Sequence, residues 1–199
     1  MTSQGNKISK SNLRIFVDSP FLVREARQFL KDMKDESHRG TALIAAEYLN
    51  EILEEFLRAY FVDDADSVKS LFADHCLLES LCSKTRIAYS IGLLPENVFK
   101  DLNCIRRIRN KFAHSYTALT FDSPKIGNWC LELTWPGDLS KICEGLGCDS
   151  NFPNKDRFIM SVVLISNELL KRASKLSHVS PAEQRELSLL PGPKQERDS

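Results

Sequence analysis

The feature that most constrains this sequence is a helical repeat of apolar side chains between residues 96 and 114. Its apolar residues recur at spacings of four, three and seven: Val98, Leu102, Ile105 and Phe112. This spacing follows the 3.6-residue period of an α-helix with one buried side. The stretch is therefore predicted to be a helix packed against a core.

The other side of this predicted helix carries an unusual run of basic and amide groups. Residues 106–114 contain three arginines, a lysine, an asparagine and a histidine, and no acidic residue. A solvated helix face normally mixes charge signs through pairs four residues apart. We therefore predict that this side faces a partner, and we take Arg106, Arg109, Asn110 and His114 as candidate binding residues.

Composition is that of an ordinary globular protein with one domain. The chain has 199 residues, 42% of them hydrophobic and 27% charged, and 27 basic residues balance 27 acidic ones. With no net charge, no global field draws the protein to nucleic acid or to an anionic membrane, so such binding would need a local patch. The polar N-terminus lacks a signal-like apolar run and no window suits a membrane span, so we expect a cytoplasmic protein.

The six cysteines do not form a metal-binding pattern. There is no C-x-x-C pair, and His75 beside Cys76 lacks the spaced partners of a structural zinc site. We predict free thiols packed as small apolar residues. The sequence gives no indication of a cofactor or a metal.

Periodicity and capping signals predict an all-α fold, a compact bundle of five or six helices with an irregular insert before the last helix. The expected helices span residues 20–34, 37–60, 78–91, 95–114, 126–131 and 154–176, with a short turn near residue 72. Residues 1–18 are predicted to be a flexible arm, 19–178 the helical domain and 179–199 a disordered tail.

Three residues mark predicted helix ends, and a fourth, Gly40, is predicted to affect helix packing. Ser19, followed by Pro20, is expected to cap the first helix, and Asn154 is expected to cap the last. Gly92 is expected to close the third helix in the left-handed conformation. Gly40, near the start of the longest helix, is expected to allow close helix packing.

Four sequence blocks, at residues 29–46, 83–94, 101–114 and 119–122, resemble the bacterial mannitol operon repressor family, and together they cover about residues 20–175. The resemblance implies an all-helical domain associated with negative regulation of carbohydrate-uptake operons. Arg39 lies in the first block, within His38-Arg39-Gly40, and its recurrence in that family makes it a second-choice binding residue.

The sequence offers no clear DNA-reading element. The basic helix has a fully periodic apolar face, and it follows a glycine-proline connection rather than the tight turn of a helix-turn-helix. We therefore expect regulation through a protein partner or a homodimer in preference to direct DNA binding, and we expect no membrane association.

A second resemblance suggests an enzyme as the alternative. Arg109-Asn110-x-x-x-His114 is similar to the R-N-x-x-x-H motif of HEPN domains, helical bundles whose ribonuclease members cleave RNA without metal, often across a dimer. In that interpretation His114 shuttles the proton and Arg109 stabilises the phosphorane charge. Residues five apart lie about 140° apart on an ideal helix, so they converge only if the helix ends near Ala113 or a second subunit contributes.

The same motif also has a purely structural interpretation. His114 caps the helix end, and Arg109 pairs with a carboxylate of the long helix, such as Glu47 or Glu51. The sequence favours a binding or structural role over catalysis and leaves the enzymatic alternative open.

Overall fold

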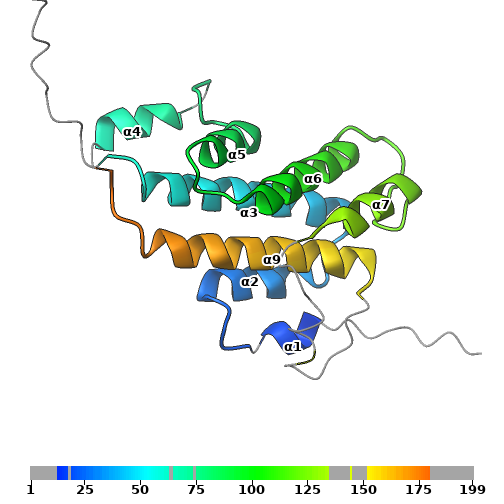
Figure 1. The fold of residues 1–199 in the computed structure, drawn as a ribbon. Helices are drawn as coiled ribbons and strands as arrows, with labels where there is room; N and C mark the ends of the chain where they lie inside the picture. Colours follow the sequence, from blue (N-terminus) through cyan, green and yellow to red (C-terminus); the bar gives the residue numbers. More distant parts are fainter. Residues whose placement is uncertain are drawn as a thin grey trace, which may run out of the picture.

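The computed structural model describes residues 13–17, 19–62, 65–73, 75–134, 144 and 152–179. Its helices are α1 (Leu13–Val17), α2 (Arg24–Met33), α3 (His38–Arg58), α4 (Ala65–Leu71), α5 (Leu81–Ser90), α6 (Glu96–Ala113), α7 (Pro124–Glu132) and α9 (Asn154–Ala173). The described ranges contain no strand, so the predicted all-α class is confirmed (Figure 1). Six of these helices have nine or more residues, which agrees with the predicted bundle.

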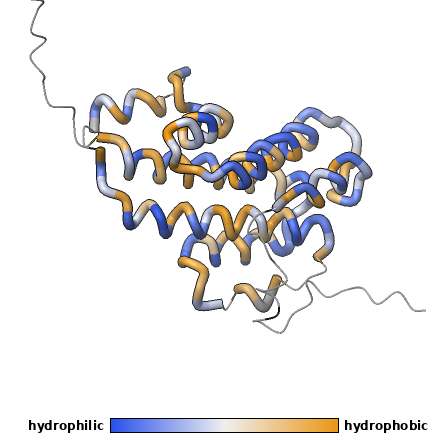
Figure 2. The backbone as a smooth tube through the Cα atoms, viewed as in Figure 1, coloured by the Kyte–Doolittle hydropathy of each residue, from blue (hydrophilic) through white to orange (hydrophobic). Residues whose placement is uncertain are grey.

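Helix α3 is the centre of the bundle, because it contacts α5, α6 and α9 (Figure 1). Its fully buried residues include Leu49, Leu53 and Leu57, and small residues such as Ala42 and Ala45 face its neighbours near the start. Burial of one leucine side chain contributes about 1.5 to 3 kcal/mol. Figure 2 shows hydrophobic residues alternating with hydrophilic ones along α3 and α6, as expected for helices with one face in a core.

Helix α9 forms the second layer and contacts α2, α3, α6 and α7. Because neighbours cover it on several sides, every residue from Phe158 to Asn167 is buried. Phe121, in the segment before α7, ties these layers together. Its ring lies 5.1 Å from the Phe112 ring of α6 and 4.9 Å from the Phe158 ring of α9, centroid to centroid.

The predicted caps at Ser19 and Asn154 are wrong. The N-cap residues of α2 and α9 are Val23 and Pro153, and long-range hydrogen bonds form at both helix starts. Helix α2 begins at Arg24, and the backbone N–H of its N-cap residue, Val23, donates to Asn167 Oδ1 of α9 at 2.8 Å. Asn154 is the first residue of α9, after Pro153, and its side-chain amide donates to Asp122 Oδ1 at 3.0 Å.

The left-handed conformation predicted for Gly92 is confirmed, with a φ of 79° after α5, and the role of Gly40 is corrected. Ser37 caps α3 by accepting a hydrogen bond from the Gly40 N–H. A Cβ at Gly40 would lie 2.1 Å from Glu36 Oε1, so the space beside this glycine holds the Glu36 carboxylate and not a packed helix.

The packed helices begin earlier than the sequence indicates. Residues 13–17, which we assigned to the arm, form α1, and Leu13 and Phe16 are buried. The Phe16 ring lies 6.3 Å from the Phe21 ring and 6.1 Å from the Phe152 ring. Two apolar residues three apart are too short a pattern to reveal such a helix.

Several predictions fall on residues outside the described ranges. These are the N-terminal arm up to residue 12, most of the insert at 135–151 and the tail from residue 180. The domain boundaries at residues 18 and 179 stay predictions. Across the described helices, none combines the length and the apolar character that a membrane crossing requires.

His38, the first residue of α3, makes the contact between α3 and Phe121 sensitive to pH. Its Nδ1 accepts the Phe121 backbone N–H at 3.2 Å, and the two rings lie 5.6 Å apart. Burial lowers the His38 pKa below its ordinary value of 6.5, as does the charge of Lys155, while Asp122 opposes the shift. A proton on Nδ1 removes the acceptor.

We therefore predict that His38 contributes stability that is fully present above about pH 6.5 and is lost as the pH falls through its lowered pKa. Thermal melts from pH 7.5 to 5 should show a steeper loss for the natural protein than for His38→Asn, whose side-chain oxygen keeps an acceptor without titrating. Parallel pH profiles for the two proteins would contradict this role.

Candidate functional site

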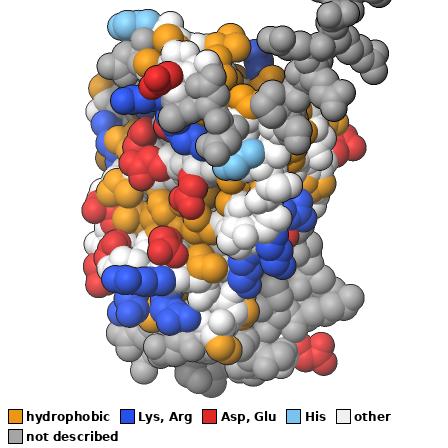
Figure 3. Space-filling model, turned by 90° about the vertical axis from the view of Figure 1, so that its left-hand side faces the viewer, with side chains coloured by type: hydrophobic (Ala, Val, Ile, Leu, Met, Phe, Trp, Pro, Cys, Tyr) orange, Lys and Arg blue, Asp and Glu red, His pale blue; other side chains and the backbone are white. Residues whose placement is uncertain are grey.

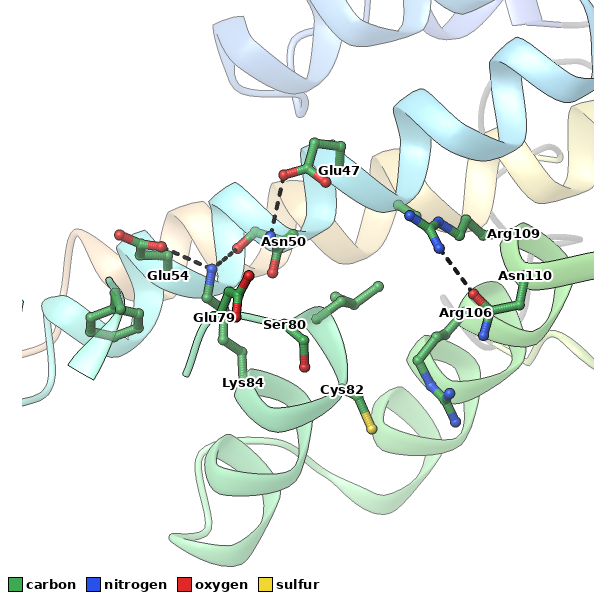
Figure 4. A pocket seen from close by; sticks show the side chains of 13 residues that line it. Glu47, Asn50, Glu54, Glu79, Ser80, Cys82, Lys84, Arg106, Arg109 and Asn110 are labelled. Atoms are coloured by element: carbon green, nitrogen blue, oxygen red, sulfur yellow. Dashed lines mark hydrogen bonds and ion pairs between the residues drawn. The ribbon is translucent and has the colours of Figure 1, made fainter. Parts of the chain in front are cut away.

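An open pocket of about 630 Å³ lies between α3, α5, α6 and the segment before α5 (Figure 4). Its size falls within the range of small-molecule sites. Its lining residues are Ala46, Glu47, Asn50, Glu54, Phe72, Glu79, Ser80, Leu81, Cys82, Lys84, Arg106, Arg109 and Asn110.

One wall of the pocket is basic and comes from α6. Arg106, Arg109 and Asn110, three of the predicted binding residues, lie on this wall (Figure 4). Arg109 Nη1 donates to Asn110 Oδ1 at 3.1 Å, whereas Arg106 Nε is buried and has no hydrogen-bond acceptor in the structure. Among the described ion pairs none involves either arginine. Two arginines therefore line the pocket without an ion-pair partner among the described residues.

The opposite wall is acidic and comes from α3. Glu47, Asn50 and Glu54 share one face of this helix because they are three and four residues apart. Asn50 Nδ2 donates to Glu47 Oε1 at 3.3 Å. The predicted pairing of Arg109 with Glu47 or Glu51 is absent among the described ion pairs. Glu47 of α3 and Arg109 of α6 instead line the same pocket from different helices.

An ion pair between a buried lysine and a partly exposed glutamate lies at one end of the pocket. Lys84 is 2% exposed, and its Nζ lies 2.8 Å from Glu54 Oε2 and donates to the Asn50 carbonyl at 3.2 Å. Arg58 also pairs with Glu54, at 2.9 Å. Burial alone would raise the Glu54 pKa, but hydrogen bonds from Lys84 and Arg58 outweigh burial and lower it.

The Lys84–Glu54 pair was not predicted from the sequence, in which Glu54, beside Glu55, has the pattern of a solvated helix face. A signal was nevertheless present, since Lys84 lies three residues after Leu81 and four before Ala88, on the same face of α5.

The structure separates the other two predicted site residues from this pocket. His114 is the exposed C-cap residue of α6, whose backbone N–H donates to the Asn110 carbonyl at 3.0 Å, and it does not line the pocket. Arg39 donates to the backbone carbonyls of Ser115 and Thr117 and so fastens the segment after α6 to the start of α3. The roles of both residues remain predictions.

A second groove, of about 410 Å³, is mainly apolar and lies at the end of the molecule where α4 packs. Its lining residues are Tyr60, Phe61, Val62, Ser67, Val68, Leu71 and Val179. Figure 3 views the molecule from that end and shows exposed hydrophobic side chains between acidic and basic ones.

The described cysteines are free thiols. Cys104 and Cys130 are buried as predicted, and burial raises their pKa to about 11 and about 12, so both stay protonated. Cys82 is half-buried, and the prediction of a packed thiol is wrong for Cys76, which is exposed. Cys143 and Cys148 lie outside the described ranges. In the described part of the chain, no group of three or more His, Cys, Asp or Glu residues is arranged to hold a metal ion.

Comparison with known proteins supports the fold. No protein-family model matches the chain, and no curated protein matches its sequence. The fold is similar to that of a chain in the X-ray structure of the MtlR-HPr complex from Escherichia coli, with a TM-score of 0.55 and 18% identity. The match covers 75% of this chain and 98% of that chain. The predicted resemblance to the mannitol operon repressor is therefore supported as a similarity of fold and not as membership of that family.

We predict that substitutions of the two members of the Lys84–Glu54 pair lower the free energy of unfolding by unequal amounts. Glu54→Ala leaves the buried Lys84 charge without its carboxylate and should cost roughly 3 kcal/mol in the free energy of unfolding. Lys84→Met should cost less than about 1.5 kcal/mol, because Glu54 is partly exposed and keeps Arg58. Urea denaturation measures both, and an equal or larger loss for Lys84→Met would contradict the assignment.

Proposed function

We propose that this protein is a helical regulatory module that binds a protein partner through the basic wall of α6. The observation that carries the proposal is the pair of arginines, Arg106 and Arg109, that lack a carboxylate partner among the described ion pairs. Guanidinium groups bind carboxylates and phosphates through two parallel hydrogen bonds. Two arginines without ion-pair partners in the described structure therefore favour binding to an anionic surface of a partner.

The fold similarity suggests which partner to test first. Since the similar chain was solved in complex with HPr, we propose an HPr-type protein as the partner of this chain. In this proposal the protein acts in the cytoplasm and represses transcription of a carbohydrate operon through the partner, without reading DNA itself. Arg39 and His114 both lie near the start of the segment that follows α6, and we keep them as rim residues of the proposed surface.

Titration calorimetry with purified HPr tests this proposal. Arg106→Gln and Arg109→Gln should each weaken binding by at least about 10-fold, because truncating one partner of an interfacial charge pair commonly costs 2 kcal/mol or more. Arg107→Gln is the matched control. Arg107 belongs to the same helix but lies 4.6 Å from the Trp129 ring and 3.5 Å from Glu132, away from the pocket.

Two results would count against this function. Absence of HPr binding would remove HPr as the partner. Tight, sequence-specific binding of operator DNA by the isolated protein in a gel shift at physiological salt would contradict regulation through a partner.

The metal-independent ribonuclease is the second candidate, and two observations favour keeping it. Helix α6 ends at Ala113, as convergence of Arg109 and His114 requires, and Arg109 carries no ion pair in the described structure. Against it, His114 does not line the pocket that Arg109 faces. We expect no EDTA-resistant cleavage of total RNA. Cleavage that His114→Ala reduces by about 10² to 10⁴ would establish the enzyme instead.

A further inference from the structure

The pocket between α3, α5 and α6 holds unpaired charges of both signs. Arg106 and Arg109 line it from α6, Glu47 lines it from α3, and Glu79 lines it from the segment before α5. None of these four side chains takes part in an ion pair within the described structure. Side chains of opposite charge therefore line one cavity without pairing with each other in the described structure.

The remaining charges of the pocket are already satisfied. Lys84 and Glu54 bind each other at 2.8 Å, and Arg58 completes the pairing of Glu54 at 2.9 Å. Among the described residues, Glu47 and Glu79 accept hydrogen bonds from neutral groups, the Asn50 amide at 3.3 Å and the His75 backbone N–H at 3.0 Å. A ligand therefore meets two free cations on one wall and two free carboxylates elsewhere.

Arg106 is the charged group of the pocket whose hydrogen-bonding capacity is least satisfied in the described structure. Its Nε is buried without an acceptor, so part of the guanidinium has lost water and gained no hydrogen bond in return. A charged donor in that condition gains more from a bound anion than a fully solvated arginine does. The recess of about 630 Å³ is large enough to hold a small molecule.

We propose that this pocket binds a small zwitterionic phosphate monoester. Its phosphate lies against Arg106, Arg109 and the Asn110 amide, and its ammonium group faces Glu47 and Glu79. A phosphate monoester carries close to two negative charges at neutral pH, which matches two guanidinium groups better than a single carboxylate does. The site needs no protein partner, so it goes beyond the proposed function and does not rest on it.

Titration calorimetry of the full chain at fixed ionic strength tests the site with four probes: phosphoethanolamine, glycerol 3-phosphate, inorganic phosphate and β-alanine. Phosphoethanolamine should bind one per chain and tightest. Glycerol 3-phosphate and inorganic phosphate lack the ammonium group, and β-alanine replaces the phosphate by a carboxylate, so all three should bind at least several-fold more weakly. Equal affinity of β-alanine and phosphoethanolamine would overturn the preference for phosphate.

Variants separate the two walls. Arg106→Gln and Arg109→Gln should weaken phosphoethanolamine binding by about 10- to 100-fold, since each removes a charged hydrogen-bond donor. Glu47→Gln should weaken phosphoethanolamine but not glycerol 3-phosphate. Arg106→Lys keeps the charge but loses Nε, so it should still bind more weakly than the natural chain. Circular dichroism melts establish that each variant is folded.

Arg107→Gln, on the other side of α6, should bind all probes as the natural chain does. The proposal is overturned if no probe binds saturably, if Arg107→Gln weakens binding as much as Arg109→Gln, or if Glu47→Gln affects both phosphate esters equally.

Discussion

Packing of α3 on three neighbouring helices is the constraint on which the rest of this structure depends. Helix α3 contacts α5, α6 and α9, and nine buried residues along one side of it make this packing possible. The strip left over, with Glu47, Asn50 and Glu54, lies between α5 and α6. The same packing that builds the core therefore fixes the acidic wall of the pocket opposite the basic wall.

Helix α6 has an apolar side that packs in the core and a basic side that lines the pocket. Its apolar side, with Leu102, Ile105 and Ile108 fully buried, anchors it to the core. This rigid attachment holds Arg106 and Arg109 at a fixed place, at the cost of leaving two charges without carboxylates in the described structure. Binding sites placed on rigid elements keep their geometry, and here the geometry presents unpaired guanidinium groups to whatever enters the pocket.

The sequence predicted the helices well because their signals are local. The start of the longest helix near residue 37 and the left-handed Gly92 depend only on nearby residues, and both are confirmed. The caps at Ser19 and Asn154 were wrong because contacts from distant segments decide where those helices begin, through Asn167 and Asp122. Local propensity contains no information about such partners.

The candidate site was predictable only in part, for the same reason. A run of basic residues without acids pointed to Arg106 and Arg109, and the structure places both in one pocket. Burial of Lys84 depends on Glu54 of another helix, and the positions of Arg39 and His114 depend on the path of the chain after Ala113. Periodicity assigns residues to faces of a helix, but it does not say which faces meet.

The central claim is that Arg106 and Arg109 are uncompensated in the free protein and find their counter-charges in a bound anion. The most direct measurement is the NMR signal of the arginine Nε–H groups in an isotope-labelled sample, assigned by substitution, without and with phosphoethanolamine. The account predicts that the Arg106 and Arg109 signals shift and that their exchange with water slows on binding, while the Arg107 signal stays unchanged. Unchanged signals from Arg106 and Arg109, or equal shifts at all three arginines, would contradict it.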